Sequence, residues 1–193
     1  MPSFAVQDPH FEASVRRSFD SLTLMGTVGA QLRSVAPGAV EIDLPFRADL
    51  TQHHGYIAAA VLTAIVDVAC GYAAMTLMPA GASVLTIEYK VNFLSPAQGE
   101  RMVARGKVVR PGRTVTVCAG DVVAIAEGTG KIVATMLATM ATVAPRVPQP
   151  ATSVTHEDEL SAHPRGPSGH SKQWCVCKTG AVRRLREMVS PRR

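Results

Sequence analysis

Asp67 is the only charged residue between His53 and Gly81, a stretch dominated by apolar side chains. An unpaired carboxylate is so costly in an apolar setting that it normally finds a polar partner or has a shifted pKa. A carboxylate held in this way can act as a general base or as a nucleophile toward a polarised carbonyl group. It can also be a structural group that accepts hydrogen bonds from neighbouring hydroxyls or amides. Asp67 is therefore the first candidate for chemistry.

The residues around Asp67 predict a long apolar helix over about 57–78. At 100° per residue, the positions within about 60° of Asp67 all carry small side chains: Ala60, Thr63, Ala64, Cys70, Gly71 and Ala74. The opposite side carries larger ones: Val61, Leu62, Ile65 and Tyr72. We expect the bulky side to face a sheet. The small side would then admit a partner helix, a second subunit or a slim ligand.

The elements that must position this helix follow from the rest of the pattern. Residues 9–21 have apolar side chains at helical spacing and predict a short amphipathic helix. Two alternating stretches, 29–36 and 39–46, flank Pro37-Gly38 and predict a hairpin. Four β-rich runs follow the long helix, separated by turn residues: 83–94, 101–110, 114–126 and 131–143. This order favours an α+β fold with an antiparallel sheet.

The long apolar segment has the length of a membrane span. Asp67 near its centre argues against that interpretation, and so do the flanking strands, whose alternation needs a partner to cover one face of the sheet. A helix that is apolar all round is better explained by a curved antiparallel sheet wrapped around it. We therefore expect no contact with a membrane.

Charge divides the chain into two parts. Residues 1–144 hold 11 basic and 11 acidic residues, whereas 145–193 hold 9 basic and 4 acidic residues. The net charge of +5 thus lies in the tail, and a neutral core predicts a small-molecule domain and not a nucleic-acid-binding one. We expect one domain over 1–144 and a disordered tail over 145–193.

No uninterrupted apolar leader is present in the first thirty residues, so a cytoplasmic location is expected. Cys70 and Cys118 fall in apolar patterns and are expected to be reduced, buried side chains. In the tail, the spacing of Cys175 and Cys177 relative to the nearby histidines fits no common zinc pattern. No metal site is predicted.

Two stretches carry a family resemblance: "DVACGYAA" on the predicted helix and "EYKVNFLSPAQGE" on the strand after it. With "GKVVRPGRTVTVCAGDVVA", they resemble the hotdog-fold acyl-CoA thioesterases of the phenylacetate-degradation (PaaI-like) family. The resemblance covers roughly residues 10–144. It implies a hotdog fold, in which a long central helix is wrapped by a curved antiparallel sheet of about six strands.

The resemblance also implies roles for individual residues. Gln52 falls where such enzymes carry an amide that helps to hold the attacking water, and Thr86 where a hydroxyl assists the carboxylate. Both also suit an ordinary loop and strand. Arg110, Gly112 and Arg113 match a turn that contacts the phosphates of coenzyme A, although a solvated turn would look the same.

The family's His-Gly-Gly-like triplet falls on Ala58, Ala59 and Ala60, so its histidine is absent here. The backbone N–H of Ala59 can still form an oxyanion hole, because amides at a helix start lack intrahelical partners. Ala59 and Asp67 are about 12 Å apart along one helix, too far to act on one carbonyl carbon. The site must therefore span two chains, in a homodimer or a dimer of dimers.

These residues predict an acyl-CoA thioesterase that acts on aryl- or medium-chain acyl groups, with coenzyme A as part of the substrate and no other cofactor. The alternative is a weakly active or non-catalytic acyl-CoA-binding hotdog protein, suggested by the alanine triplet. A hotdog dehydratase is disfavoured, because no histidine follows a helical Asp at the spacing that this chemistry needs.

Overall fold

A computed structural model of the protein describes residues 4–144. The elements, in chain order, are α1 (Phe11–Ser21), α2 (Thr23–Val28), β1 (Gln31–Ala36), β2 (Ala39–Pro45), the 3-10 turn η1 (Ala48–Leu50), α3 (Ala59–Met75), β3 (Ser83–Phe93), β4 (Arg101–Arg110), β5 (Val115–Ala126) and β6 (Thr129–Val143). The expected order of a helix, two strands, a long helix and four strands is confirmed. The short α2 and η1 were not predicted.

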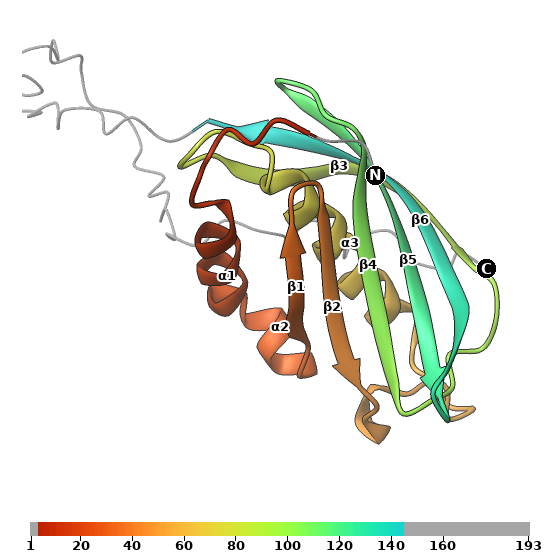
Figure 1. Ribbon diagram of the computed structural model, residues 1–193. Coiled ribbons are helices and arrows are strands. Elements are labelled where there is room, and N and C mark those ends of the chain that lie inside the picture. Colours follow the sequence, from red (N-terminus) through yellow and green to blue (C-terminus); the bar gives the residue numbers. More distant parts are fainter. Residues whose placement is uncertain (1–3, 145–193) are drawn as a thin grey trace, which may run out of the picture. The chain divides into compact units, whose positions relative to one another are not determined.

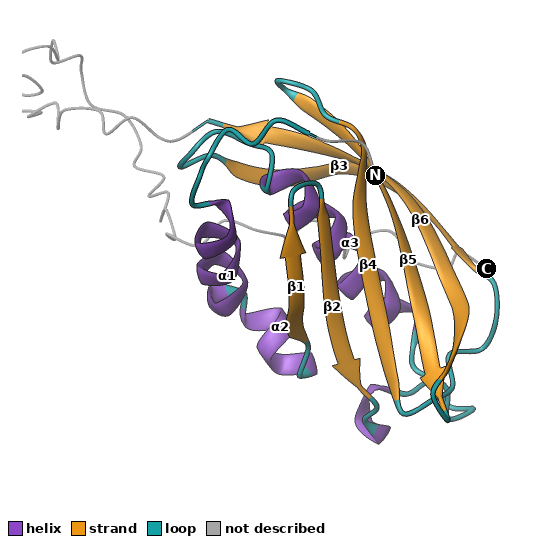
Figure 2. Ribbon diagram, viewed as in Figure 1, coloured by secondary structure: helices purple, strands orange, loops and turns teal. Residues whose placement is uncertain are grey.

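The strands form one antiparallel sheet in the order β1-β2-β4-β5-β6-β3. The sheet curves, and α3 lies in its hollow, while α1 and α2 lie beside β1 (Figure 1). The secondary-structure colouring shows the same arrangement as a single sheet with helices on one side (Figure 2). The predicted α+β hotdog architecture, with its central helix and six strands, is therefore confirmed.

Two glycines let α3 approach the sheet closely. A Cβ atom added at Gly106 of β4 would lie 2.3 Å from the backbone of Ala69. One added at Gly120 of β5 would lie 2.6 Å from Val66 and 2.7 Å from the sulfur of Cys70. Any larger residue would push the helix outward, so these positions fix the depth of α3 in the sheet.

The faces of α3 differ in part from the helical-wheel prediction. The helical wheel predicts Cys70 on the small, open side, but its sulfur faces Gly120 in the sheet. The wheel predicts Tyr72 against the sheet, but this side chain lies against α1. Its ring is 6.0 Å from that of Phe19, and its hydroxyl oxygen is 3.1 Å from that of Ser18. The curved sheet contacts more of the helix circumference than a flat sheet would, and α1 covers part of the rest.

The hairpin between β1 and β2 turns at Pro37-Gly38, as predicted. Gly38 adopts a φ of 74°, a left-handed conformation that glycine tolerates best. Its N–H donates to the buried hydroxyl of Thr76 at 2.7 Å, just after the end of α3. This bond ties the turn to the central helix.

Cys70 and Cys118 are free and buried, as expected, and burial raises the pKa of the Cys118 thiol to about 12. The predicted tail and its cysteines and histidines lie outside the described residues, so the division into a domain and a tail stays a prediction. Within residues 4–144, no helix is long and apolar enough to cross a membrane.

Candidate active site

Asp67 lies in the middle of α3 and is partly buried. The hydroxyl of Thr86, on β3, donates a hydrogen bond to Asp67 Oδ1 at 2.8 Å. These residues are 19 positions apart in sequence, and the packing of α3 against β3 brings them together. The expected partnership of carboxylate and hydroxyl therefore has the geometry it requires, and its catalytic role stays a prediction.

Burial raises the pKa of Asp67 above its ordinary value, and the hydrogen bond from Thr86 lowers it in part. A carboxylate with a raised pKa is a stronger base once ionised, because the charge is less well solvated. Among the described residues, no positively charged side chain pairs with Asp67. Desolvation, and not an ion pair, sets the basicity of this group.

The start of α3 is uncapped. Its N-cap residue, Ala58, has no side chain that could accept a hydrogen bond from the first amides of the helix. Ala59 and Ala60, the first two residues of the helix, are exposed. Their N–H groups have no intrahelical partner and lie at the positive end of the helix dipole. The helix start is thus available to an anion or a developing oxyanion.

The segment that leads into α3 is held from two sides. The Ala58 N–H donates to the Leu50 carbonyl at 3.0 Å, and the Ile57 N–H donates to the Ala97 carbonyl at 3.1 Å. These bonds fix the direction from which the chain enters the helix, and so the place where the Ala59 amide points.

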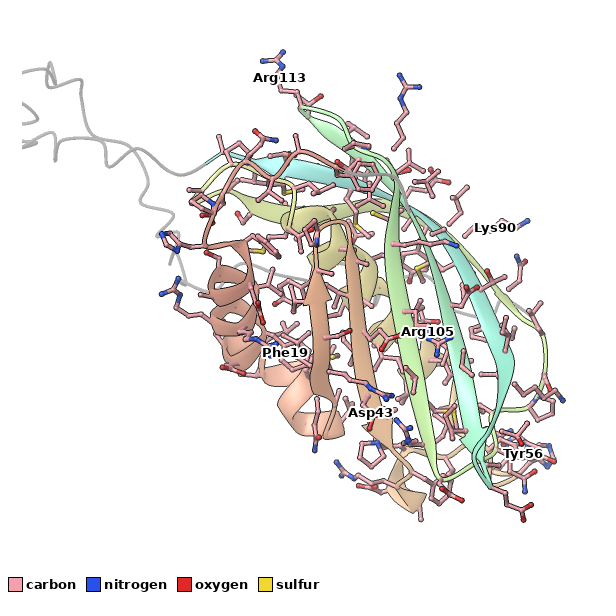
Figure 3. All side chains as sticks on the ribbon, in the orientation of Figure 1. Phe19, Asp43, Tyr56, Lys90, Arg105 and Arg113 are labelled. Atoms are coloured by element: carbon pink, nitrogen blue, oxygen red, sulfur yellow. The ribbon has the colours of Figure 1, made fainter. Side chains whose placement is uncertain are left out.

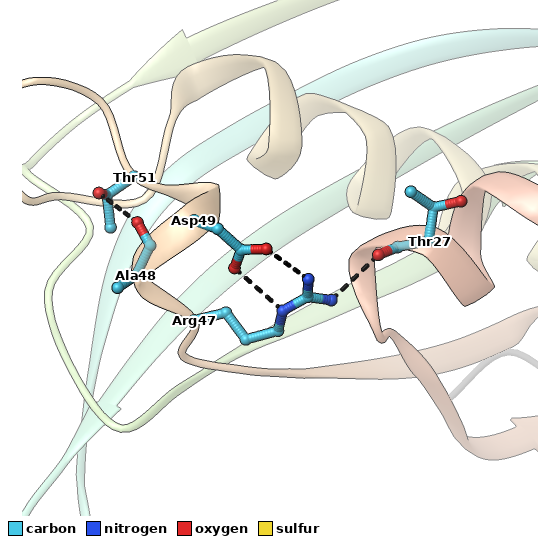
Figure 4. A network of polar contacts seen from close by, with 5 residues as sticks. All are labelled: Thr27, Arg47, Ala48, Asp49 and Thr51. Atoms are coloured by element: carbon cyan, nitrogen blue, oxygen red, sulfur yellow. Dashed lines mark hydrogen bonds and ion pairs between the residues drawn. The ribbon is translucent and has the colours of Figure 1, made fainter.

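Arg47 connects the chain just before this segment to the end of α2. Its guanidinium donates to both carboxylate oxygens of Asp49, at 3.1 and 2.6 Å, and to the carbonyl of Thr27, at the end of α2, at 3.0 Å (Figure 4). The hydrogen bond from Arg47 holds the pKa of Asp49 below its ordinary value. No sequence signal indicates this connection, because it depends on where α2 ends in space.

Gln52 lies in the loop before α3, and its side-chain oxygen accepts a hydrogen bond from the backbone N–H of His54. The acceptor of the amide is therefore engaged in shaping the loop. An amide oxygen has two lone pairs, so this oxygen can still accept a hydrogen bond from a water molecule, and the Nε2 group can donate one. The role expected for Gln52 in holding the attacking water stays a prediction.

The turn of Arg110, Gly112 and Arg113 joins β4 to β5. A Cβ at Gly112 would lie 2.1 Å from the Val115 carbonyl oxygen, so the turn requires glycine there. Neither arginine forms an ion pair with any described residue. Arg113 extends from the tip of this hairpin, at the opposite end of the sheet from Tyr56, which lies just before α3 (Figure 3). The turn is therefore remote from the helix start of its own chain.

One chain thus brings together only part of the predicted site. Asp67 and Thr86 are in contact, whereas Ala59, at the start of α3, is about 12 Å from Asp67 along the helix. Gln52 lies in the loop before that helix start. Within residues 4–144, no three His, Cys, Asp or Glu side chains cluster in a way that could hold a metal ion. The chemistry available is that of a desolvated carboxylate and free backbone amides.

Several known proteins are similar to this chain. Residues 54–131 match the Thioesterase superfamily. The structure of a thioesterase family protein from Silicibacter pomeroyi is 44% identical, with a TM-score of 0.68, and the match covers 69% of this chain and 98% of that one.

Two further proteins are similar over most of their length. A phenylacetic acid degradation-related protein from Ralstonia eutropha is 27% identical, with a TM-score of 0.59, over 68% of this chain and 98% of that one. A Halobacterium salinarum protein named provisionally as an esterase is 29% identical over 60% of this chain and 79% of its own.

Proposed function

Because this chain belongs to the thioesterase superfamily, as a PaaI-like hotdog hydrolase, we propose that it cleaves acyl-CoA thioesters with aryl- or medium-chain acyl groups. The single observation that carries the proposal is the partly buried Asp67 carboxylate, oriented by Thr86 and without a cationic partner among the described residues. A group placed in this way can activate a water molecule or attack the thioester directly.

The proposed reaction uses two groups. The Asp67 carboxylate either removes a proton from water as the water attacks the thioester carbonyl, or it adds to that carbonyl itself. In the second case loss of the thiolate leaves an acyl-aspartyl anhydride, which a water molecule then hydrolyses to release the acid and restore the carboxylate. The backbone N–H of Ala59 stabilises the oxyanion that forms, and the thiolate of coenzyme A leaves and takes up a proton. The Nε2 group of Gln52 donates a hydrogen bond beside this centre. Hydrolysis by this route requires no metal ion and no oxidant or reductant.

The two groups belong to different chains in this proposal. In the described structure β3 pairs only with β6, so its outer edge is free, and it carries exposed apolar side chains: Leu85, Ile87, Tyr89 and Phe93. A long apolar edge strand is a template for pairing with another chain. At the other end of the sheet, α1 and α2 lie beside β1 (Figure 1). We therefore propose a homodimer in which two β3 strands pair.

Antiparallel pairing of β3 would also bring the two α3 helices side by side. Ala60, Thr63 and Ala64 lie on the exposed or partly exposed part of the small stripe. Small side chains allow close approach of two helices, and an antiparallel pair places the Asp67 of one chain opposite the Ala59 of the other. Two equivalent sites result, and such dimers can associate further into a dimer of dimers.

The decisive experiment is Asp67→Asn assayed by thiol release against a panel of acyl-CoAs. We expect turnover to fall by about 10³-fold, since a general base contributes roughly 10²–10⁴. The variant should stay folded. Because burial raises the pKa of Asp67, ionisation opposes folding at neutral pH, and the neutral amide should melt at or above the wild-type temperature. Unchanged turnover would remove Asp67 from the mechanism.

A second candidate function is acyl-CoA binding with little hydrolysis. It is favoured by Ala58, which supplies no polar side chain where the family carries histidine. Calorimetry with a non-hydrolysable acyl-CoA thioether, beside the thiol-release assay, separates the two candidates. Tight binding with no turnover of any acyl-CoA supports the second, whereas turnover of about 1 per second or more contradicts it.

A further inference from the structure

An apolar surface lies on the outer face of the sheet, the side that faces away from α3. In β5, Gly120 faces α3, so the alternate residues Val115, Val117 and Ala119 point outward. Strand pairing places Leu137 of β6 beside Ala119, and Leu137 is 56% exposed. Figure 2 shows the described helices on the other side of the sheet. No helix of residues 4–144 therefore covers this surface.

This surface continues across two more rows of the sheet. Thr139 pairs with Val117, and Ala141 pairs with both Val115 of β5 and Leu85 of β3. Leu85 is 62% exposed. A contiguous exposed apolar patch on a protein marks a site of interaction. We name this patch the outer band, and it consists of Leu85, Val115, Val117, Ala119, Leu137, Thr139 and Ala141.

Opposite charges stand at the two ends of one row of the outer band. Across four strands the row reads Arg110, Val117, Thr139 and Glu88. Neither Arg110 nor Glu88 forms an ion pair with a described residue. Three interstrand spacings separate them, about 14 Å in all, so they do not pair within one chain. Each charge is therefore available to another molecule.

This row is complementary to a second copy of itself. If two chains lie back to back about a two-fold axis that runs along the strands, Arg110 of each chain faces Glu88 of the other. A two-fold interface requires such a self-complementary surface. A partner with one sign of charge would match one end of the row and repel the other. The charges of this row thus favour a second copy over an acidic or a basic partner.

The neighbouring row ends in two like charges, Lys107 and Lys90, on either side of Ala119 and Leu137. Lysine side chains are long, and they can keep their ammonium groups in water while their stems cover apolar surface. These lysines therefore belong at the rim of the contact, with Leu137 nearer its centre.

The proposed β3 pairing gives the outer band enough area. In one chain the Cα atoms of the band span only about 13 Å along the strands and about 10 Å across them. A standard interface buries about 800 Å² on each partner, so one band alone is too small to hold two chains together. In the β3-paired dimer, two bands lie on one continuous outer face, and a second dimer contacts both at once. Two linked contacts bind far more tightly than one.

We propose that the outer band is a contact between copies of this chain, which joins two β3-paired dimers back to back, with Arg110 of one chain facing Glu88 of another. The inference goes beyond the proposed function, because the outer band lies on the opposite side of the sheet from α3 and Asp67. Each proposed reaction site needs only one dimer. Hydrolysis is therefore expected to survive the loss of this contact.

The first test is the mass of the full-length protein by sedimentation equilibrium. We expect four chains in the wild type and two in Leu137→Glu, because the variant buries an unpaired charge in the centre of the contact. The kcat of Leu137→Glu should be unchanged. The matched control is Ile132→Glu, which introduces the same charge at another exposed side chain of β6, outside the outer band. It should keep four chains and full activity.

The second test exchanges the charges at the two ends of the row. Glu88→Arg or Arg110→Glu alone should weaken the association of dimers by at least about 100-fold, since like charges then face each other twice in the interface. The two changes together should restore the affinity to within about tenfold of the wild type. Because the two residues are about 14 Å apart in one chain, such a rescue requires contact between chains.

Thermal melting of each variant identifies any that is misfolded, and Leu137→Lys, an independent change at the same exposed side chain, should also give two chains. A wild type no larger than two chains would leave the outer band to a different partner and overturn the proposal. An unchanged mass in both Leu137 variants, or charge reversals without rescue, would overturn it as well. A protein of four chains that hydrolyses no thioester would refute the proposed function and leave this contact standing.

Discussion

Asp67 is partly buried, and one of its two carboxylate oxygens accepts a hydrogen bond. Both features affect how it would work as a base. The Thr86 hydroxyl holds Oδ1 at 2.8 Å, which leaves the second oxygen free to face a reactant. Burial raises the pKa of Asp67, and the hydrogen bond from Thr86 lowers it in part. The pH at which Asp67 becomes active is therefore set by Thr86 as well as by the depth of α3.

Removing the hydroxyl with Thr86→Val should move the acidic limb of the pH–rate profile to higher pH. The sign follows because the base must be ionised, and loss of the hydrogen bond leaves burial to raise the pKa unopposed. On the plateau we expect a loss of about fivefold in kcat from poorer orientation. Thr86→Ser, which keeps the hydroxyl, is the control. An unchanged acidic limb in the valine variant would mean that Thr86 does not act on Asp67.

Sequence alone could identify some of these residues and not others. Asp67 is detectable because it is the only charge within a long apolar stretch. Thr86 could be chosen only through the family resemblance, since many strand threonines look alike. The hydrogen bond from the His54 N–H to Gln52 and the bond from Arg47 to the Thr27 carbonyl depend on loop conformation, which no local sequence pattern specifies.

At the scale of elements, the start of α3 offers a test that touches a single N–H group. Proline is well tolerated at the first helical position, where its missing N–H would have no intrahelical partner. The preceding residue, Ala58, has φ −63° and ψ 141°, which suits a residue before proline. Ala59→Pro should therefore preserve the helix and remove only the proposed oxyanion donor.

We expect Ala59→Pro to lower kcat by about 10²–10³-fold, the usual cost of one oxyanion-hole donor, while the melting temperature changes little. Ala59→Gly retains the N–H and serves as the control. Circular dichroism melts and thiol release, measured on the same preparations, separate catalysis from stability. A proline variant as active as its parent would show that another group stabilises the oxyanion.

Most elements could be predicted from the sequence because their periodicity is regular, and the strand and long-helix positions agree with the structure. The six-residue helix α2 is not predicted, because it is short and contains Gly26, a residue of low helix propensity. The predicted orientations of Cys70 and Tyr72 are wrong because the prediction assumes a flat sheet that contacts only one side of α3. Gly106 and Gly120 lie where the curved sheet contacts α3. Their role in this contact cannot be predicted from the sequence, because it depends on how the strands pair.

At the scale of the whole molecule, the free edge of β3 is where a second chain is expected. Ile87 lies on this edge strand at a bulge and is 60% exposed. Ile87→Lys places a charge on each side of the proposed β3 pair, and like charges facing each other oppose pairing. We expect a monomer by analytical ultracentrifugation and at least a tenfold loss of kcat, since each site needs two chains.

The matched control is Ile132→Lys, which introduces the same charge at another exposed isoleucine, on β6, the strand next to β3 and not itself at the free edge. It should remain associated and active. If the Ile87 variant keeps the wild-type mass and activity, then β3 is not the contact between chains, and the dimer must use another surface.

Shared sites make a stronger prediction, because two inactive proteins should restore each other. In a dimer of one Asp67→Asn chain and one Ala59→Pro chain, one site carries both defects and the other carries neither. Random mixing gives half heterodimers, each with one intact site, so the mixture should recover about one quarter of wild-type activity. A purified, doubly tagged heterodimer should recover about one half. If Asp67 and the oxyanion donor belonged to the same chain, every site in the mixture would carry one defect, and mixing would restore nothing.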